Sequence, residues 1–298
     1  MKDKNSSVLF QRIAFIGFGL IGSSLARVVR RRGLAGHIAV CTRRRETLDK
    51  ARALQLADSV SLDAEEVARG ADLVMICTPL SSYSEIAAAI VPALETDCIV
   101  SDVGSVKTSV LRQLGPLLPA GVHLVPGHPV AGTEHSGIDA GSAELFAGRW
   151  CILTPPPGTP VAVTERVAEL WRRAAMNVEI MDPEHHDQVL AMTSHLPHLI
   201  AYSIVDTATD LEGQLKKEVV KYSAGGFRDF TRIAASNPVM WRDIFLANRE
   251  AVLEVLSRFN EDLTALQRAI RRGQGDKLEV AFSRTREIRR GVIDAKQD

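Results

Sequence analysis

The feature that most constrains this chain is a glycine-rich turn near its N-terminus. Residues 17–22 read GFGLIG, a GxGxxG pattern that follows an apolar, strand-like run and opens a helical pattern ended by Gly33. In such a turn the first glycine permits a tight bend, the second lets the backbone approach a pyrophosphate, and the third allows the helix to pack closely on the strand. The N–H groups at the start of the helix then favour phosphate. We predict that a dinucleotide contacts Gly17, Gly19, Leu20, Ile21 and Gly22; the alternative is a glycine-rich turn without a ligand.

Short apolar runs alternate with helical patterns through the first 182 residues. Strands are predicted over Arg12–Gly17, His37–Thr42, Ala71–Thr78, Cys98–Val103, His123–Pro126, Trp150–Thr154 and Val178–Met181. Helices are predicted between them over Ser23–Arg32, Arg45–Leu54, Tyr83–Leu94, Val106–Leu118 and Val161–Ala175. This alternation predicts an α/β fold, a Rossmann-like and mostly parallel sheet covered by helices.

The pattern changes at Asp182–Pro183, where strand-like runs give way to helical spacing. Long helices are predicted over Asp187–Thr209, with a possible break at Pro197, and over Pro238–Arg272 and Lys277–Ile293. We therefore expect two domains, a dinucleotide-binding domain over 1–182 and an all-α domain over 183–298. A length of 298 residues agrees with two domains of roughly 150 residues each.

Charge and apolar content exclude several classes of protein. The chain has 36 Lys and Arg against 36 Asp and Glu, a balance that argues against binding to nucleic acid or to an anionic membrane. Its apolar stretches are far shorter than the roughly 18 residues of a membrane helix, and its N-terminus lacks the pattern of a secretory signal. The four cysteines show no CxxC spacing. These features favour a protein of the reducing cytoplasm.

The end of the second predicted strand lacks the acid that NAD sites usually place there. It reads Thr42-Arg43-Arg44-Arg45, and the first carboxylate is Glu46. An acid at this position binds the ribose 2′-hydroxyl of NAD, whereas an arginine suits the 2′-phosphate of NADP. We expect Thr42 and Arg43 to contact the cofactor, with NADP used at least as well as NAD. The alternative is that the arginines form a solvated turn.

Two segments that follow strand ends carry polar residues. They are SDVGSVK at 101–107 and the loop GHPVAGTEHSG at 127–137, and an open α/β sheet binds its ligands at such ends. Histidine is well suited to exchange a proton near neutral pH, so His128 is a candidate base. The alternative is a structural histidine bonded to backbone. His135 is interpreted as a solvated loop residue.

The helical half contributes two further motifs. SHLPH at 194–198 places two histidines on one helix face, but no carboxylate or thiol is spaced to complete a metal site. GGFRDFTR at 225–232 brings two arginines and an aspartate together ahead of a helix. An arginine there would bind a carboxylate bidentately, cap a helix or form an ion pair between domains.

Together these motifs resemble the prephenate/arogenate dehydrogenase family, and most of all the bacterial cyclohexadienyl dehydrogenases, which accept both substrates. The resemblance covers about residues 10–265 and runs in order through both halves. Its motifs are GFGLIGSS at 17–24, CTPL at 77–80, SDVGSVK at 101–107, GHPVAGTEHSG at 127–137, ILTP at 152–155, HHDQVLAMTSHLPH at 185–198 and AGGFRDFTRIAASNPVMWRDIFLAN at 224–248. Agreement over this many motifs is more specific than any single one.

The resemblance implies an NAD(P)-dependent oxidative decarboxylation in tyrosine biosynthesis, from prephenate to 4-hydroxyphenylpyruvate or from arogenate to tyrosine. By the family's pattern His128 takes the proton of the ring hydroxyl, Ser105 touches that hydroxyl, and Arg232 holds a substrate carboxylate. The same pattern implies no metal and a homodimer formed by the helical domain. It places His198, Thr133, Glu134 and Trp241 at the pocket or its entrance, and Thr78 and Pro79 at the cofactor.

Two other classes of protein share part of this pattern. β-Hydroxyacid dehydrogenases and imine reductases combine a Rossmann domain with a helical one, but they often use a lysine on a helix of the second domain as acid or base. A non-catalytic nucleotide sensor would keep GxGxxG without needing both His128 and Arg232 in their present contexts. In this chain the candidate base, His128, belongs to the first domain, which counts against the enzymes with a second-domain lysine. Both classes are therefore less favoured than a prephenate/arogenate dehydrogenase.

Overall fold

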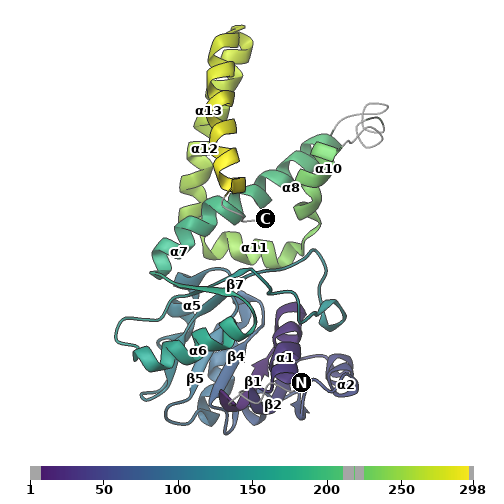
Figure 1. Cartoon of the computed structure of the whole chain (residues 1–298), viewed down its shortest axis with the longest axis vertical. Coiled ribbons are helices and arrows are strands. Elements are labelled where there is room, and N and C mark those ends of the chain that lie inside the picture. Colours follow the sequence, from purple (N-terminus) through teal and green to yellow (C-terminus); the bar gives the residue numbers. More distant parts are fainter. Residues whose placement is uncertain (1–7, 211–217, 219–224, 295–298) are drawn as a thin grey trace. The chain divides into compact units, whose positions relative to one another are not determined.

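A parallel sheet with helices around it forms the N-terminal part of the molecule (Figure 1). The computed structural model describes residues 8–210, 218 and 225–294, without the side chains of 292–294. The chain forms two compact units, Met1–Arg249 and Glu250–Asp298. The strand order in the first unit, β3-β2-β1-β4-β5-β6, is the order of a dinucleotide-binding sheet. The predicted Rossmann-like fold is confirmed.

The central strands of this sheet are buried on both faces, as helices on both sides require. Every residue of β4 and β5 is buried. The sequence missed β3 and α3, because elements of three to five residues carry too little periodicity to be recognised. The strands are β1 (Phe10–Ile16), β2 (Ala35–Cys41), β3 (Ser59–Ser61), β4 (Leu73–Ile76), β5 (Ile99–Asp102) and β6 (His123–Val125). The helices between them are α1 (Leu20–Arg32), α2 (Arg45–Ala53), α3 (Ala64–Ala68), α4 (Tyr83–Ile90) and α5 (Lys107–Leu114).

A second sheet of three strands was not predicted. It contains β7 (Gly127–Val130), β8 (Trp150–Leu153) and β9 (Asn177–Ile180), with α6 (Val161–Arg173) between the last two. β7 is antiparallel to β8, and β8 is parallel to β9. The start of the GHPVAGTEHSG segment is thus a strand, and the prediction of a loop there was wrong. Pro129 hides the strand in the sequence, because proline is tolerated only where a strand lies at a sheet edge, as β7 does.

After β9 every described element is a helix, so the predicted helical C-terminal region is confirmed. The helices are α7 (Pro183–Leu190), α8 (Leu196–Thr209), α10 (Gly225–Thr231), α11 (Pro238–Ala247), α12 (Arg249–Arg271) and α13 (Gly275–Asp294). Among the described residues, none of these helices has the length and apolar character needed to cross a membrane. The compact units divide at Arg249, and the domain boundary at Asp182–Pro183 stays a prediction.

Two predicted helices differ from the observed ones in their interruptions. A π-helical stretch, Ala191–His195, joins α7 to α8, so the chain does not break at Pro197. That proline lies in the first turn of α8, where its missing N–H costs little. The helix expected over Pro238–Arg272 is two helices, because α11 ends at Ala247 and α12 begins at Arg249.

Side-chain caps fix the start of α7 and of α11, the second of which carries Trp241. The Asp182 carboxylate accepts hydrogen bonds from the N–H groups of Glu184 and His185 at the start of α7. The Asn237 side chain accepts from two N–H groups at the start of α11 in the same way. In each case a proline follows the cap, which is a strong signal for a helix N-terminus.

Candidate functional site

The carboxyl ends of four neighbouring strands meet at one edge of the parallel sheet. Ile16 is in register with Cys41 and with Ile76, and Ile76 is in register with Asp102. The residue that follows each of these therefore lies at the same edge, where open α/β sheets bind ligands. The segments that begin there are the glycine turn after β1, Thr42 after β2, residues 77–79 after β4 and residues 103–106 after β5.

The glycine turn has open space at its second glycine and none at the other two. A Cβ on Gly17, whose φ is +92°, would lie 2.7 Å from the carbonyl oxygen of Cys77, and a Cβ on Gly22 would lie 2.8 Å from the carbonyl oxygen of Gly17. No described atom lies within 4 Å of the corresponding position on Gly19. Helix α1 begins at Leu20 with no side-chain cap and no acid in its first turn. These residues fit a pyrophosphate that approaches the backbone at Gly19.

The residues after β2 and β4 complete this part of the edge. Thr42 is half-buried and Arg43 is exposed, so a threonine stands where NAD-preferring sites place an acid. The first carboxylate, on Glu46, lies 3.4 Å from the Lys50 ammonium on α2. After β4, the Thr78 methyl lies 2.8 Å from the Cβ position of Gly17, and Pro79 is exposed.

His128 lies beside a second buried histidine, which comes from α7. Nδ1 of His128 is 2.8 Å from Nε2 of His186, and the two rings meet edge to face with centroids 5.0 Å apart. Nδ1 of His186 is in turn 2.7 Å from Oδ1 of Asp187. Nδ1 of His128 is therefore hydrogen-bonded to a side chain 58 residues away. The alternative interpretation, a structural histidine bonded to backbone, does not describe this nitrogen.

Both sides of this histidine pair are anchored on the loop and helix that follow β5. The Asp187 carboxylate accepts from the backbone N–H groups of Lys107 and Thr108, at 2.8 and 3.0 Å, and from the Thr108 hydroxyl. The buried Lys107 ammonium donates to the Asp102 carboxylate and to the Gly127 carbonyl oxygen. Gly127 directly precedes His128, so the same segment fixes the base and its partner. Ser105, half-buried, belongs to this loop.

A third buried histidine extends the network to α11. The Asn248 side chain donates to the carbonyl oxygen of Asp187 at 2.8 Å, and its nitrogen lies 3.1 Å from Nδ1 of His195. The His195 ring meets Trp241 edge to face at 6.1 Å, and Trp241 stacks on His198 with centroids 3.6 Å apart. Three predicted site residues, His128, Trp241 and His198, thus belong to one chain of contacts. We call this set of residues the histidine network: His128, His186, Asp187, Asn248, His195, Trp241 and His198.

The remaining predicted residues lie on exposed segments. The Arg232 guanidinium is 3.3 Å from the Glu134 carboxylate, and the Arg232 side chain is 62% exposed. The Thr133 hydroxyl accepts a hydrogen bond from the backbone N–H of His135 at 3.2 Å, and His135 is exposed, as expected for a loop residue. Arg228 is 3.6 Å from Asp229 of its own helix. The structure thus brings Arg232 and Glu134 together, while their contact with a substrate stays a prediction.

Burial keeps the histidines of the network neutral at neutral pH. It lowers the pKa of His128 well below the ordinary 6.5, and the nearby His186 lowers it further. Burial lowers the pKa of His186 by more than the hydrogen bond to Asp187 raises it, and it lowers the pKa of His195 to about 4. Burial raises the pKa of Asp187, but hydrogen bonds to its carboxylate, first that of His186, outweigh this effect and hold the pKa below its ordinary value. His128 is therefore available as a base at neutral pH.

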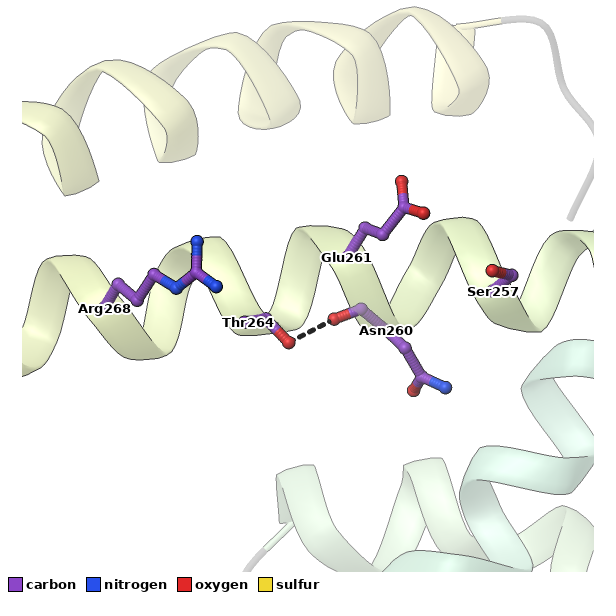
Figure 2. A pocket seen from close by; sticks show the side chains of 5 residues that line it. All are labelled: Ser257, Asn260, Glu261, Thr264 and Arg268. Atoms are coloured by element: carbon purple, nitrogen blue, oxygen red, sulfur yellow. Dashed lines mark hydrogen bonds between the residues drawn. The ribbon is translucent and has the colours of Figure 1, made fainter.

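A separate hollow runs along α12 in the second compact unit (Figure 2). It is lined by side chains of that one helix, and the Thr264 hydroxyl donates to the Asn260 carbonyl oxygen at 2.7 Å. None of the residues predicted for the site lies there. The lining residues are Ser257, Asn260, Glu261, Thr264 and Arg268.

The sequence pointed to His128 but not to the side chains that contact it. His186 and Asp187 entered only as letters of the HHDQ motif, because nothing nearby in the sequence connects them with a residue 58 positions earlier. A usable signal was the cap at Asp182, which fixes the start of α7. From that start, helical spacing places His186 and Leu190 on the buried face and His185 on the exposed one.

Two family models match successive parts of the chain. Residues 25–180 match the family described as prephenate dehydrogenase, nucleotide-binding domain, and residues 182–284 match prephenate dehydrogenase, dimerization domain. The chain belongs to the prephenate dehydrogenase family. The cyclohexadienyl dehydrogenase of Zymomonas mobilis is 43% identical over 281 residues, which are 94% of this chain and 96% of that protein.

Solved structures of this family share the fold over nearly the whole chain. The prephenate dehydrogenase from A. aeolicus, in complex with hydroxyphenyl propionate and NAD+, has a TM-score of 0.87 at 36% identity, covering 95% of this chain and 98% of that one. The arogenate dehydrogenase of Synechocystis has a TM-score of 0.79 at 29% identity, covering 93% and 98%. The predicted family resemblance is confirmed.

Proposed function

We propose that this prephenate dehydrogenase family member catalyses the NAD(P)-dependent oxidative decarboxylation of prephenate and of arogenate. The observation that carries the proposal is a buried, neutral His128 just after the carboxyl end of β6, a strand of the same parallel sheet in which β1 leads into the open glycine turn. The names of its relatives support it, since they include a cyclohexadienyl dehydrogenase, a prephenate dehydrogenase and an arogenate dehydrogenase.

His128 handles the proton of the ring hydroxyl in this reaction. A bound nicotinamide supplies the acceptor for the hydride that leaves the carbon bearing that hydroxyl. As the carbon–oxygen bond gains double-bond character, the O–H bond breaks and the proton passes to His128. The ring–carboxylate bond then breaks, carbon dioxide leaves, and the electron pair of that bond makes the ring aromatic. The proton returns from His128 to the oxygen, so the base ends as it began. A positioned base contributes about 10²–10⁴ in rate.

The other side chains bind and orient. We assign Ser105 to the ring hydroxyl, Arg232 to a substrate carboxylate, and His198, Thr133, Glu134 and Trp241 to the pocket or its entrance. Support comes from the contacts of Trp241 with His198 and of Arg232 with Glu134. The cofactor is assigned to the residues at the strand ends, namely Gly17, Gly19, Leu20, Ile21, Gly22, Thr42, Arg43, Thr78 and Pro79.

We also propose that NADP serves at least as well as NAD, because Thr42 replaces an acid after β2. The division at 182/183 and a homodimer complete the proposal. The regions that match the two family models end at residue 180 and begin at residue 182, which supports this division. The second model is described as a dimerization domain, which supports a homodimer. Exposed apolar side chains in the second unit supply surface for a dimer; they are Leu253, Leu263, Ile270, Val280, Phe282 and Ile288.

Arg232→Ala is expected to raise the KM for prephenate more than it lowers kcat. A bidentate arginine–carboxylate contact exists in the ground state and the transition state alike, and its loss costs roughly ten- to hundredfold in affinity. Arg228→Ala is the matched control, four residues away on the same segment. A normal KM in Arg232→Ala together with a raised KM in Arg228→Ala transfers the assignment to Arg228.

Steady-state cofactor reduction with prephenate tests the proposed function. The purified chain should reduce NADP or NAD with prephenate and with arogenate. β-Hydroxyacids and cyclic imines, with the matching cofactor form, serve as parallel substrates. Turnover of those compounds but not of prephenate or arogenate would overturn the proposal in favour of another dehydrogenase or reductase. Cofactor binding without any turnover would favour a nucleotide sensor.

A further inference from the structure

We propose that His186 and Asp187 are positioning residues that hold His128 in a single tautomer, with its proton on Nδ1 and its lone pair on Nε2. Nε2 is then the atom that takes the proton of the substrate. The proposal rests on the proposed function, in which His128 is the base. It adds two residues to the reaction that neither the sequence motifs nor the family descriptions assign.

Asp187 sets the direction of the hydrogen bonds that reach His128. Its pKa is held below the ordinary value, so at neutral pH it is a carboxylate, which only accepts hydrogen bonds. The carboxylate accepts hydrogen bonds from the backbone N–H groups of Lys107 and Thr108 and from the Thr108 hydroxyl. Its remaining partner among the described residues is Nδ1 of His186. Nδ1 of His186 must therefore carry a proton, and this N–H donates a hydrogen bond to the carboxylate.

His186 is neutral at neutral pH, and this decides which of its nitrogens accepts a hydrogen bond. Burial lowers its pKa below the ordinary 6.5, so the ring carries one proton at neutral pH, and that proton is on Nδ1. Nε2 of His186 then has only a lone pair. Since Nε2 lies 2.8 Å from Nδ1 of His128, Nδ1 of His128 must donate, and its Nε2 is left unprotonated. The hydrogen bonds run in one direction, from His128 through His186 to Asp187.

This arrangement also stabilises the charge that forms during the reaction. When Nε2 of His128 takes the hydroxyl proton, the ring becomes an imidazolium whose Nδ1–H is already bonded to His186. The negative carboxylate of Asp187 lies at the far end of the same chain of hydrogen bonds and stabilises the new positive charge electrostatically. A base oriented by a second group, which is itself oriented by a third, is the general arrangement of activated catalytic side chains.

The two residues differ in how much of their role is structural. Asp187 also binds the N-terminal amides of α5, so its replacement would disturb the fold. Among the described residues, the His186 side chain makes hydrogen bonds to His128 and Asp187 alone. A buried polar ring costs desolvation that an apolar side chain at this position would avoid. His186 is therefore the residue whose replacement separates orientation from folding.

Nitrogen-15 NMR of the histidine side chains tests the tautomer directly, in the free enzyme and without turnover. His128 should show a protonated Nδ1 and an unprotonated Nε2, with its signals assigned by their loss in His128→Asn. A His128 with its proton on Nε2 would overturn the proposal. The measurement does not involve a substrate. The proposed tautomer can therefore be wrong while prephenate turnover is observed, or right while it is not.

A pair of variants at residue 186 tests the consequence for catalysis. His186→Gln keeps an amide oxygen that can accept from His128 and an N–H that can donate to Asp187, so kcat should stay within a few-fold of the wild type. His186→Phe removes the acceptor and should lower kcat by roughly ten- to hundredfold, the usual cost of losing the partner that orients a functional histidine, with KM almost unchanged. His185→Gln on the exposed side of α7 is the matched control. Equal loss in Gln and Phe, or a change in KM alone, would mean a structural role only. If His186→Phe does not fold, the tautomer measurement and the Gln variant still decide.

Discussion

The glycine turn after β1 and the histidine network around β7 are built in opposite ways. The glycine turn occupies six consecutive residues, 17–22, and acts through backbone N–H groups and the absence of side chains. The hydrogen bonds that join the separate elements of the histidine network connect residues 53 to 61 positions apart in the sequence, from β7, α7, the π-helical stretch and the end of α11. A site made of backbone leaves a motif in the sequence, whereas a site made of distant side chains becomes visible only in the folded chain. The two regions should therefore fail differently when they are altered.

The largest effect is expected at the chemical end of the histidine network. His128→Asn keeps a hydrogen-bond donor but cannot take the proton, so kcat should fall by about 10²–10⁴. The KM for prephenate should change little, because a base acts mainly in the transition state. Steady-state kinetics at neutral pH measure both constants. A variant with near-wild-type kcat would remove His128 from the reaction.

Acidification is expected to destabilise the folded protein through the histidine network. The glycine turn, which has no titratable side chain, should not contribute. In the unfolded chain His195 takes up a proton near pH 6.5, but in the folded chain burial delays this to about pH 4. Between these values the unfolded state binds more protons, so the free energy of unfolding falls as the pH falls. The loss amounts to about 3 kcal/mol for a shift of this size.

Urea unfolding across that pH window measures the effect. His195→Asn should flatten the fall in stability, whereas Gly19→Ala, which changes no titratable group, should leave the slope of the wild type. Equal slopes in wild type and His195→Asn would show that His195 does not contribute.

A pair of glycine substitutions separates folding from cofactor binding at the turn. Gly17→Ala puts a side chain at φ +92° and 2.7 Å from a backbone oxygen, which should cost about 1–3 kcal/mol of stability. Gly19→Ala meets no described atom within 4 Å, so its melting temperature should match the wild type while its KM for the cofactor rises. Thermal unfolding and cofactor titration measure both. An unchanged cofactor KM in Gly19→Ala would contradict a pyrophosphate at this glycine.

The smallest effect is expected at the end of β2. Thr42→Asp introduces a carboxylate that repels a 2′-phosphate, so kcat/KM for NADP relative to NAD should fall by roughly tenfold or more. Kinetics with the two cofactors in wild type and variant give this ratio. A wild type that prefers NAD tenfold, or a ratio that the substitution does not move, would contradict the role of Thr42.

The same contrast explains what the sequence could predict. Strands β1, β2, β4 and β5 and helix α1 were predicted because apolar runs and the cap at Gly33, whose φ is 63°, are local signals. The strand β7 was missed because Pro129 looks like a loop residue. The second sheet was missed because nothing in Trp150–Leu153 says with which strand it pairs.

Candidate residues divide along the same line. His128 was predicted because it stands in a polar segment after a strand end, and Arg232 because the motif around it resembles that of the dehydrogenase family. His186 was not predicted, since its importance depends on a contact with β7 that no local pattern encodes. Asn248 was not predicted either, because its position between α11 and α12 reads as continuous helix.

The most direct test of the account is the ratio of carbon dioxide released to cofactor reduced, measured with prephenate in a sealed vessel. If a cofactor held by the turn at Gly19 and the base at His128 act on one substrate, the wild type should form carbon dioxide and reduced cofactor in equal amounts. Both should fall together in His128→Asn. Cofactor reduction without carbon dioxide, or carbon dioxide without cofactor reduction, would contradict the account.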